Sequence, residues 1–300
     1  MITVVIPAYK KTKMLVENLR HNLSYLTLKK CEVIVVNDDP SESIRKDLQP
    51  FNLTLLENKK NLGFGGAVTV GVKKAKGQYI MLLNSDVILH NDSYKNALVH
   101  FKKNKKLFAV SFLQKEKNNE KIGKNRLYWK MGFIQHGKAL DLSFGLTGWA
   151  EGGACMIRKG LYQKLGGFDE IYSPFYWEDI DLSYRAWKSG YTILFDPTVE
   201  VTHHHESTIG TYFTPLHVRK IAYRNQFFFV WKNITSSLLL ISHVLLVLPN
   251  IVLHFFQGDF LFLKSFFLAL KKLPTVIQAR KSAGPDFVRS DREVLSTFHE

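Results

Sequence analysis

Cysteine is scarce in this chain: Cys31 and Cys155 are the two among 300 residues. They lie far apart in hydrophobic, strand-like runs, which favours reduced, buried thiols in a cytosolic compartment over a disulfide framework. The sequence also lacks zinc-finger spacing, an RNP-like aromatic motif and a long basic helix, so nucleic acid is not an expected partner. A secretion signal is not predicted either, because residues 2–7 enter a strand pattern at once.

Acidic residues are in deficit as well. The chain has 41 Lys and Arg against 26 Asp and Glu, a formal net charge of +15. Such an excess predicts an anionic partner, and with nucleic acid disfavoured the candidates are a nucleotide and an acidic lipid surface. The 46% hydrophobic content is enough to bury a substantial core, in one large domain or two of ordinary size.

Apolar, β-branched runs alternate with helical spacing in the first third of the chain. The runs cover residues 2–6, 33–36, 53–56 and 79–83, and between 64 and 75 apolar residues recur at i, i+3, i+4 and i+7. This alternation predicts an α/β fold with a mostly parallel sheet flanked by helices. Because such sheets bind ligands at the carboxyl ends of their strands, functional residues are expected at 7–10, 37–39, 57–61 and 84–86.

The remaining two thirds of the chain are more varied. Residues 102–130 are rich in Lys and Asn, which predicts a helix end followed by a mobile loop outside the core. Two strands are expected at 192–195 and 199–202. Beyond residue 232 the chain becomes hydrophobic, with an almost uncharged run at 238–256. We therefore expect one domain at 1–232 and a hydrophobic helical tail at 233–300.

Three arrangements are open to this tail. About 20 apolar residues suffice for a spanning helix, but two histidines, a proline and an asparagine interrupt the run. A helix pair lying in the membrane interface is favoured, because Lys264 and Lys271 share one helical face. A hydrophobic cap on the globular domain, or a dimer surface, would need no membrane.

Three carboxylates crowd behind bulky aromatic residues in the run FYWEDID at 175–181. Like charges this close push one another's pKa values apart, which is typical of a site that manages a proton, a cation or an acceptor hydroxyl. Acidic residues are also ordinary in the first turn of a helix, where they meet its positive end. Function and helix capping are therefore both open for this run.

Other polar residues suggest a bound cation and a bound base. Asp86 follows the strand at 79–83, where a carboxylate can hold Mg²⁺ or Mn²⁺ with substrate phosphates, or end the strand in an Asx turn. His203 and His205 share one face of a strand, with His204 on the other, so the pair can bind a cation or be solvated. Asp38 can accept a hydrogen bond from a uracil or thymine imide, or serve a turn.

A resemblance to a known family rests on six motifs in order: VVIPAY (4–9), VVND (35–38), NLGFG (61–65), LLNSD (82–86), GGFDE (166–170) and WEDID (177–181). This order resembles family 2 glycosyltransferases over about residues 1–232, and the rhamnosyltransferase-like branch most closely. The resemblance implies a GT-A nucleotide-sugar-binding fold and an inverting mechanism. It also implies a nucleoside-diphosphate-sugar donor and a glycan or lipid-linked acceptor.

The resemblance also implies roles for individual residues. Asp179 would be the general base that removes the proton of the acceptor hydroxyl. Asp86 would hold a divalent cation, Mg²⁺ or Mn²⁺, on the diphosphate, with His203 as the second ligand and His205 as its substitute. Donor and acceptor contacts would come from a further set, in which the last two are the weaker assignments: Pro7, Ala8, Tyr9, Asp38, Asn61, Gly63, Ser85, Trp177 and Glu178.

The chain departs from the family pattern in several places. Lys10 and Thr69 each stand where Asn is common, and Asn84 takes the first position of the D-x-D signature. In addition, Asn37 with Pro40 makes the nucleobase loop less typical of the family. A nucleotidyltransferase of related fold is a competing hypothesis, but it should present a glycine-rich phosphate loop after the first strand, and residues 7–11 contain no glycine.

A non-catalytic membrane-surface scaffold is the other competing hypothesis, and it would explain the basic charge and the hydrophobic tail. It would have no need for Asp86, Asp179 and His203 together. We therefore predict a metal-dependent hexosyl or rhamnosyl transferase that is cytoplasmic and peripheral on the inner face of the cell membrane. Its expected role is cell-surface polysaccharide synthesis.

Overall fold

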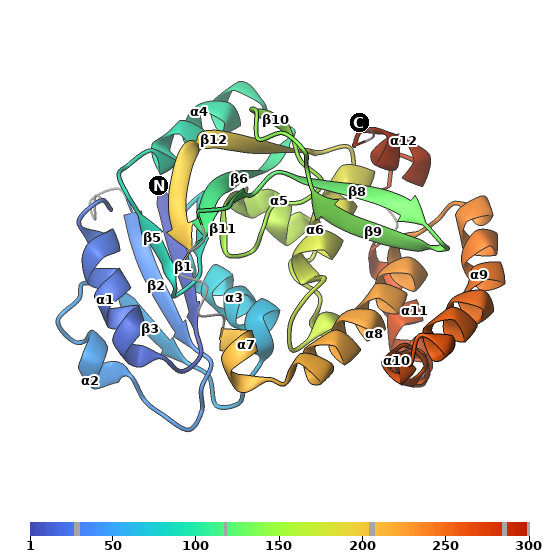
Figure 1. The fold of residues 1–300 in the computed structure, drawn as a ribbon. Helices are drawn as coiled ribbons and strands as arrows, with labels where there is room; N and C mark the ends of the chain where they lie inside the picture. The colour runs from blue at the N-terminus through green and yellow to red at the C-terminus, as the bar shows by residue number, and fades with distance from the viewer. Residues whose placement is uncertain (27–30, 117–118, 204–207, 284–286, 299–300) are drawn as a thin grey trace.

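The computed structural model describes residues 1–26, 31–116, 119–203, 208–283 and 287–298. Within these ranges a large central sheet is covered by helices on both faces (Figure 1). Its strands are β1 (Ile2–Ala8), β2 (Cys31–Asn37), β3 (Thr54–Glu57), β4 (Tyr79–Leu83), β5 (Val87–Leu89), β6 (Leu107–Glu116), β7 (Lys121–Ile122), β10 (Gly145–Leu146), β11 (Ala154–Arg158) and β12 (Thr192–His203). A separate hairpin of β8 (Asn125–Lys130) and β9 (Phe133–Lys138) extends away from it.

The helices fall into two groups along the chain. Those connecting the strands are α1 (Thr12–Leu23), α2 (Arg45–Leu48), α3 (Gly63–Lys74), α4 (Tyr94–Lys103), α5 (Lys159–Lys164), the 3₁₀ turn η1 (Glu170–Tyr172) and α6 (Glu178–Lys188). Those after the sheet are α7 (Thr208–Tyr212), α8 (Pro215–Asn233), α9 (Ser237–Phe256), α10 (Phe260–Lys271), α11 (Leu273–Ala283) and α12 (Asp291–Ser296).

The sheet has a parallel half and a mixed half. Its main path runs β10, β12, β6, β11, β4, β1, β2, β3. β1 pairs in parallel with β2 and β4, and β2 pairs in parallel with β3, as the alternation of strands and helices predicts. β11 is antiparallel to both β4 and β6, and β12 returns in parallel beside β6.

Side chains of the central strands point alternately to two hydrophobic cores, one on each face of the sheet. In β1, for example, Val4 and Ile6 join the core beneath α1 and α4, whereas Val5 joins the core that includes α3 and α6. Because both faces are covered, the strands read as continuous apolar runs. The predicted strands and the predicted helix after residue 63 are confirmed in this region.

The predicted loop at 102–130 is wrong beyond the end of α4. Residues 107–116 form β6, a central strand between β11 and β12, and Leu107, Ala109 and Val110 are fully buried. The error arises because the lysines and asparagines on both sides of the apolar run at 107–113 dominated the composition, although the run itself is like those of β1 and β4. The two strands expected at 192–202 are one strand, β12, whose register slips around Pro197.

The hydrophobic tail packs on the rest of the protein. α10 and α11 lie against α8, where Phe262, Ala269 and Val276 are buried, and α12 lies against α6. These residues belong to the same hydrophobic core as the sheet-facing side of α6. α9 lies at the edge of the molecule, next to the tip of the β8–β9 hairpin (Figure 1).

Candidate active site

A cavity of about 540 Å³ opens at the carboxyl ends of β1, β2 and β4 and extends to the first turn of α6. Every predicted site residue that the structure describes lines this one cavity: Pro7, Ala8, Tyr9, Asp38, Asn61, Gly63, Ser85, Asp86, Trp177, Glu178, Asp179 and His203. His205 lies outside the described residues. Segments as distant as β1 and α6 therefore meet around one space, as the sequence predicts.

Asp38 directly follows β2, on the cavity wall formed at the carboxyl ends of β1, β2 and β4. Its carboxylate accepts hydrogen bonds from Asn58 Nδ2 at 2.8 Å and from the Leu62 N–H at 2.9 Å. Burial raises the pKa of Asp38 in spite of these donors. The carboxylate thus fixes the loop that leads into α3 and lines the cavity at the same time.

Asp86 and His203 are brought together by strand pairing. β5 begins directly after Asp86 and is antiparallel to β12, in a register that sets Val87 opposite His203. His203 Nε2 lies 3.2 Å from Asp86 Oδ1, and His203 Nδ1 lies 3.4 Å from Glu116 Oε1. Burial lowers the pKa of His203, but the carboxylates of Asp86 and Glu116 outweigh it, so the pKa is raised overall. An imidazole and a carboxylate oxygen therefore converge at one end of the cavity.

The three crowded carboxylates of α6 separate into two environments. Asp181 points into the core. Its Oδ2 lies 2.7 Å from Arg185 Nη2, and its Oδ1 lies 2.9 Å from Lys232 Nζ. Burial alone would raise the pKa of Asp181, but these two cations hold it at about 2. Glu178 and Asp179 line the cavity instead. Asp181 is thus structural, and the other two remain available for chemistry.

Asp179 is held by backbone donors from two elements. Its Oδ1 accepts from the Ile180 N–H at 2.8 Å, and its Oδ2 accepts from the Gly152 N–H at 3.3 Å. Burial raises the pKa of Asp179 to about 6, a value suited to accepting a proton near neutral pH. A Cβ at Gly152 would lie 2.7 Å from the Phe64 ring of α3, so any other residue would require that ring to shift.

Glu178 is buried beside Asp179, and its Oε2 has no hydrogen-bond partner among the described residues. Burial and the neighbouring carboxylate raise the pKa of Glu178 well above its ordinary value. The protonated form of Glu178 is therefore favoured far more than in an ordinary glutamate, and its Oε2 can form a hydrogen bond with a bound hydroxyl.

The sequence profile described as Glycosyl transferase family 2 matches residues 3–166, more than half of the chain. The chain belongs to this family. Among curated relatives, the poly-beta-1,6-N-acetyl-D-glucosamine synthase of Staphylococcus aureus strain COL is 25% identical over 201 residues, which cover 65% of this chain and 48% of the relative. The synthase of Staphylococcus epidermidis is 24% identical over the same shares. The chain spans about half the length of the curated relatives it matches.

Three solved structures share the fold. GalNAc-T7 with UDP, GalNAc and Mn²⁺ matches with a TM-score of 0.61 and 16% identity over 77% of this chain and 48% of that one. S. aureus TarS 1–349 matches with a TM-score of 0.54 and 15% identity, over 99% and 90% of the two chains. The mannosyltransferase PcManGT of Pyrobaculum calidifontis, with GDP-Man and Mn²⁺, matches at 0.53 and 16%, over 99% and 78%. At these identities the likeness concerns the fold alone, and the predicted fold class is confirmed.

This family 2 glycosyltransferase has cavity residues that the sequence did not single out. Glu151 lines the cavity, where its carboxylate accepts hydrogen bonds from Gln114 Nε2 and from Asn125 Nδ2 at 2.9 Å. Its place in the run GWAEGG was the signal that would have found it. His136, on β9, lines the cavity in edge-on contact with Trp149 and Trp177. No local pattern marks His136.

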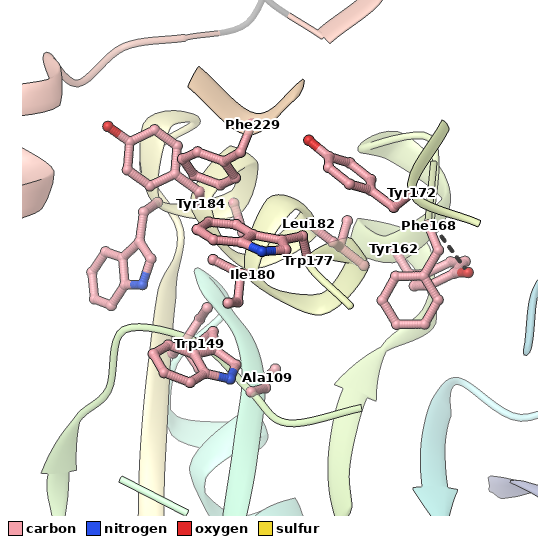
Figure 2. Packing of buried hydrophobic residues seen from close by; sticks show 14 of the residues in the cluster. Ala109, Trp149, Tyr162, Phe168, Tyr172, Trp177, Ile180, Leu182, Tyr184 and Phe229 are labelled. Carbon is pink, nitrogen blue, oxygen red and sulfur yellow. Dashed lines mark hydrogen bonds between the residues drawn. The ribbon is translucent and has the colours of Figure 1, made fainter. Parts of the chain in front are cut away.

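Trp177 contributes more to the core than to the cavity surface. Figure 2 shows its indole between Phe229 and Ile180, and its ring centroid lies 5.2 Å from that of Phe229. Only 4% of its surface is exposed. A face of Trp177 is therefore not open for stacking on a sugar in this structure, and the exposed aromatic ring at the cavity is that of Tyr176.

Proposed function

We propose that this protein transfers a sugar, with inversion, from a nucleoside-diphosphate-sugar to a hydroxyl of a glycan or lipid-linked acceptor in cell-surface polysaccharide synthesis. The observation that carries the proposal is the convergence of Asp38, the Asp86–His203 pair and Asp179 around one cavity. Membership of family 2 and the likeness to polysaccharide synthases support it. A hexosyl or rhamnosyl donor, as the motif resemblance implies, remains part of this proposal.

The end of the cavity where Asp86 and His203 meet suits a divalent metal. Asp86 supplies a carboxylate oxygen, the ligand type that suits Mn²⁺ and Mg²⁺ when substrate phosphates complete the set, and His203 places an imidazole nitrogen beside it. The described residues hold no group of three or more His, Cys, Asp and Glu side chains arranged as a complete metal site. When bound, the cation would offset the charge that develops on the departing diphosphate. The Mn²⁺ in two of the similar structures supports this assignment.

Asp179 would carry out the proton transfer. As the acceptor oxygen bonds to the anomeric carbon and the bond from that carbon to the diphosphate breaks, the hydroxyl proton passes to the Asp179 carboxylate. The N–H groups of Gly152 and Ile180 orient that carboxylate. One in-line displacement inverts the anomeric centre, so no covalent enzyme intermediate is required.

We expect Asp86→Ala to weaken Mn²⁺-dependent donor binding by about tenfold or more, because one of two protein ligands is lost. Calorimetric titration with UDP-, dTDP- and GDP-sugars, with Mn²⁺ or with EDTA, measures the effect. Asp92→Ala, at an exposed aspartate a few residues further on, is the matched control and should bind as the wild type does. Equal Mn²⁺-dependent affinity in both variants would remove Asp86 from this role, and no binding of any donor to the wild type would favour the scaffold hypothesis.

We further propose that the tail lies on a membrane surface. Among the described residues α9 is the helix long and apolar enough to cross a membrane, with only 11% of its apolar window buried. Its inner side, however, makes polar contacts: His243 Nδ1 donates to the Gly132 carbonyl at 2.7 Å, and Asn250 Nδ2 donates to the Met131 carbonyl at 3.0 Å. A helix docked in this way lies along the protein, so it would rest in the interface plane and not span it.

Charge and exposure on the outer side of the tail fit an anionic lipid surface. Leu238 and Leu245 of α9 are 78% and 68% exposed. On α10 the exposed face carries Phe260, Lys264, Phe267 and Lys271 at helical spacing, a pattern typical of interfacial helices. Between residues 233 and 283 the sequence has one acidic residue and five basic ones. A second copy of the same surface would bring like charges together, which disfavours self-association.

We expect the double variant Leu245→Asp, Leu248→Asp to lose most of its binding to vesicles that contain phosphatidylglycerol, because two charges would enter the acyl region. Cosedimentation with such vesicles measures the loss, and added salt should weaken wild-type binding. Leu140→Asp is the control, since Leu140 is 81% exposed but lies far from α9 in the chain. Undiminished sedimentation of the double variant would contradict the proposed surface.

A further inference from the structure

The turn that precedes the base is held in a left-handed backbone conformation. Tyr176 and Trp177 have φ angles of +69° and +79°, and neither is a glycine. Bulky L-residues rarely adopt this region, because their side chains crowd the backbone there, so the turn is strained. α6 begins at the next residue, with Glu178 and Asp179 in its first turn. The surrounding structure must therefore hold this turn in place, and with it the direction of Asp179.

Asn225, on α8, makes the contacts that hold the turn. Its side chain is fully buried, and its Nδ2 lies 2.9, 3.1 and 2.8 Å from the carbonyl oxygens of Tyr172, Phe175 and Tyr176. Its Oδ1 accepts from Arg224 Nε at 3.0 Å and from Arg224 Nη2 at 2.8 Å. Carbonyl groups only accept and a guanidinium only donates, so the chemistry leaves one orientation for the amide.

Arg224, the preceding residue of α8, also binds a carbonyl group of this segment. Its Nη2 donates to the Ser173 carbonyl at 2.7 Å. Burial lowers the pKa of Arg224 to about 10, which still leaves the guanidinium charged at neutral pH. Two adjacent residues of α8 thus bind the backbone carbonyls of most of the segment 172–176. Both residues lie outside the matched range 3–166, in a part of the chain where the sequence motifs assign no role.

We propose that Asn225 is a positioning residue for the general base, an inference that rests on the proposed role of Asp179. Without its two N–H groups the left-handed turn would relax and the first turn of α6 would rotate. The hydrogen bond from the Gly152 N–H to Asp179 would then lengthen. Cation and nucleotide contacts would change less, because Asp38, Asp86 and His203 belong to other elements. The loop at 62–64 meets the segment 172–176 through the Pro174 carbonyl and the Ser173 hydroxyl, which Asn225 does not bind.

Asn225→Asp tests the proposal, because the carboxylate has the same shape and still accepts from Arg224 but cannot donate to carbonyls. We expect kcat to fall by about 10²-fold, the cost typical of a small misplacement of a catalytic group. The donor affinity measured by calorimetry with Mn²⁺ should change by less than about threefold. The acid limb of the pH profile of kcat should shift from its wild-type position. Gln226→Glu is the matched control: it makes the same chemical change on the next residue, whose Nε2 donates to the Ile134 carbonyl, and it should retain wild-type kcat.

A second variant and a second measurement keep the test decisive. If Asn225→Asp does not fold, Arg224→Met removes the group that orients the amide at a half-buried position, and a kcat loss of about tenfold with unchanged donor affinity is expected. Wild-type kcat and pH profile in a folded variant would overturn the proposal. Amide hydrogen exchange at residues 176–181 should also rise in either variant, and unchanged exchange would equally overturn it. If the wild type releases no nucleoside diphosphate while exchange still rises, the proposed function fails and the positioning contact stands.

Discussion

Asp179→Asn should reduce sugar transfer by about 10²- to 10⁴-fold, the usual contribution of a general base, while donor binding in Mn²⁺ stays near the wild-type value. The reason is that an amide cannot take the proton of the acceptor hydroxyl, whereas the donor contacts lie on other elements. Release of nucleoside diphosphate in the presence of acceptor measures transfer, and calorimetry measures donor affinity. Equal release by variant and wild type would remove Asp179 from the base role.

The pH dependence of the same variant has a definite sign. Because the pKa of Asp179 is about 6, wild-type activity should fall about tenfold per pH unit below that value, as the carboxylate becomes protonated. The residual activity of Asp179→Asn should show no such limb. A pH–rate profile of kcat from pH 5 to 8 checks both statements.

Stability should respond in the opposite direction to activity. A raised pKa means that the folded state favours protonated Asp179, so the stability it contributes is present below about pH 4 and is lost as pH rises through about 6. Asp179→Asn should therefore unfold at a higher temperature than the wild type at pH 7.5, with no difference below about pH 4. Asp181→Asn is the contrasting control: the pKa of Asp181 is lowered to about 2, so its loss should destabilise the protein at neutral pH.

Asp291→Ala should lower the free energy of unfolding by about 3–5 kcal/mol, the typical cost of breaking one side of a buried ion pair. Asp291 Oδ1 lies 2.7 Å from Lys188 Nζ, and both side chains are buried. Its Oδ2 also accepts from the N–H groups of Thr235 and Ser236, at the entry to α9. The variant would leave the buried Lys188 ammonium with Thr235 Oγ1 but without its counter-ion, and two backbone donors without partners. Urea unfolding measures the loss.

The controls for this prediction come from the same region. Arg292→Ala, at the exposed neighbouring residue, should leave the free energy of unfolding unchanged. Replacing both partners, Lys188→Met with Asp291→Leu, should recover part of the loss, because no unpaired charge remains buried. Burial alone would raise the pKa of Asp291, but Lys188 holds it below its ordinary value, so the contribution is present above about pH 4 and is lost as the pH falls further. A single variant as stable as the wild type would contradict the prediction.

This ion pair also changes how membrane binding is best tested. Removing everything after residue 235 would delete Asp291 and the helices that cover α8, so loss of folding is expected in place of clean release from vesicles. Substitutions on the exposed side of α9 leave these contacts intact. They therefore separate a role in membrane binding from a role in folding.

The parallel half of the sheet and part of the candidate site could be predicted from patterns of neighbouring residues. The parallel half of the sheet was predictable because alternation of apolar runs and helical spacing is a property of neighbouring residues. Asp38 and Asp86 could be found because they directly follow buried strands, and Asp179 because three carboxylates crowd at one helix start. The central strand β6 was missed because its apolar run at 107–113 lies between segments rich in Lys and Asn, whose composition is typical of a loop.

The sequence by itself determined the fold class, the family and the chemical character of the residues at the strand ends, because these follow from short-range order and from motifs. Only the tertiary structure decided which carboxylate of α6 pairs with the core and which faces the cavity. It also placed Glu116 beside His203, His136 beside Trp177 and Asn225 beneath the turn before Asp179. These contacts join residues far apart in the chain, and they depend on strand register and helix packing, which no local pattern encodes.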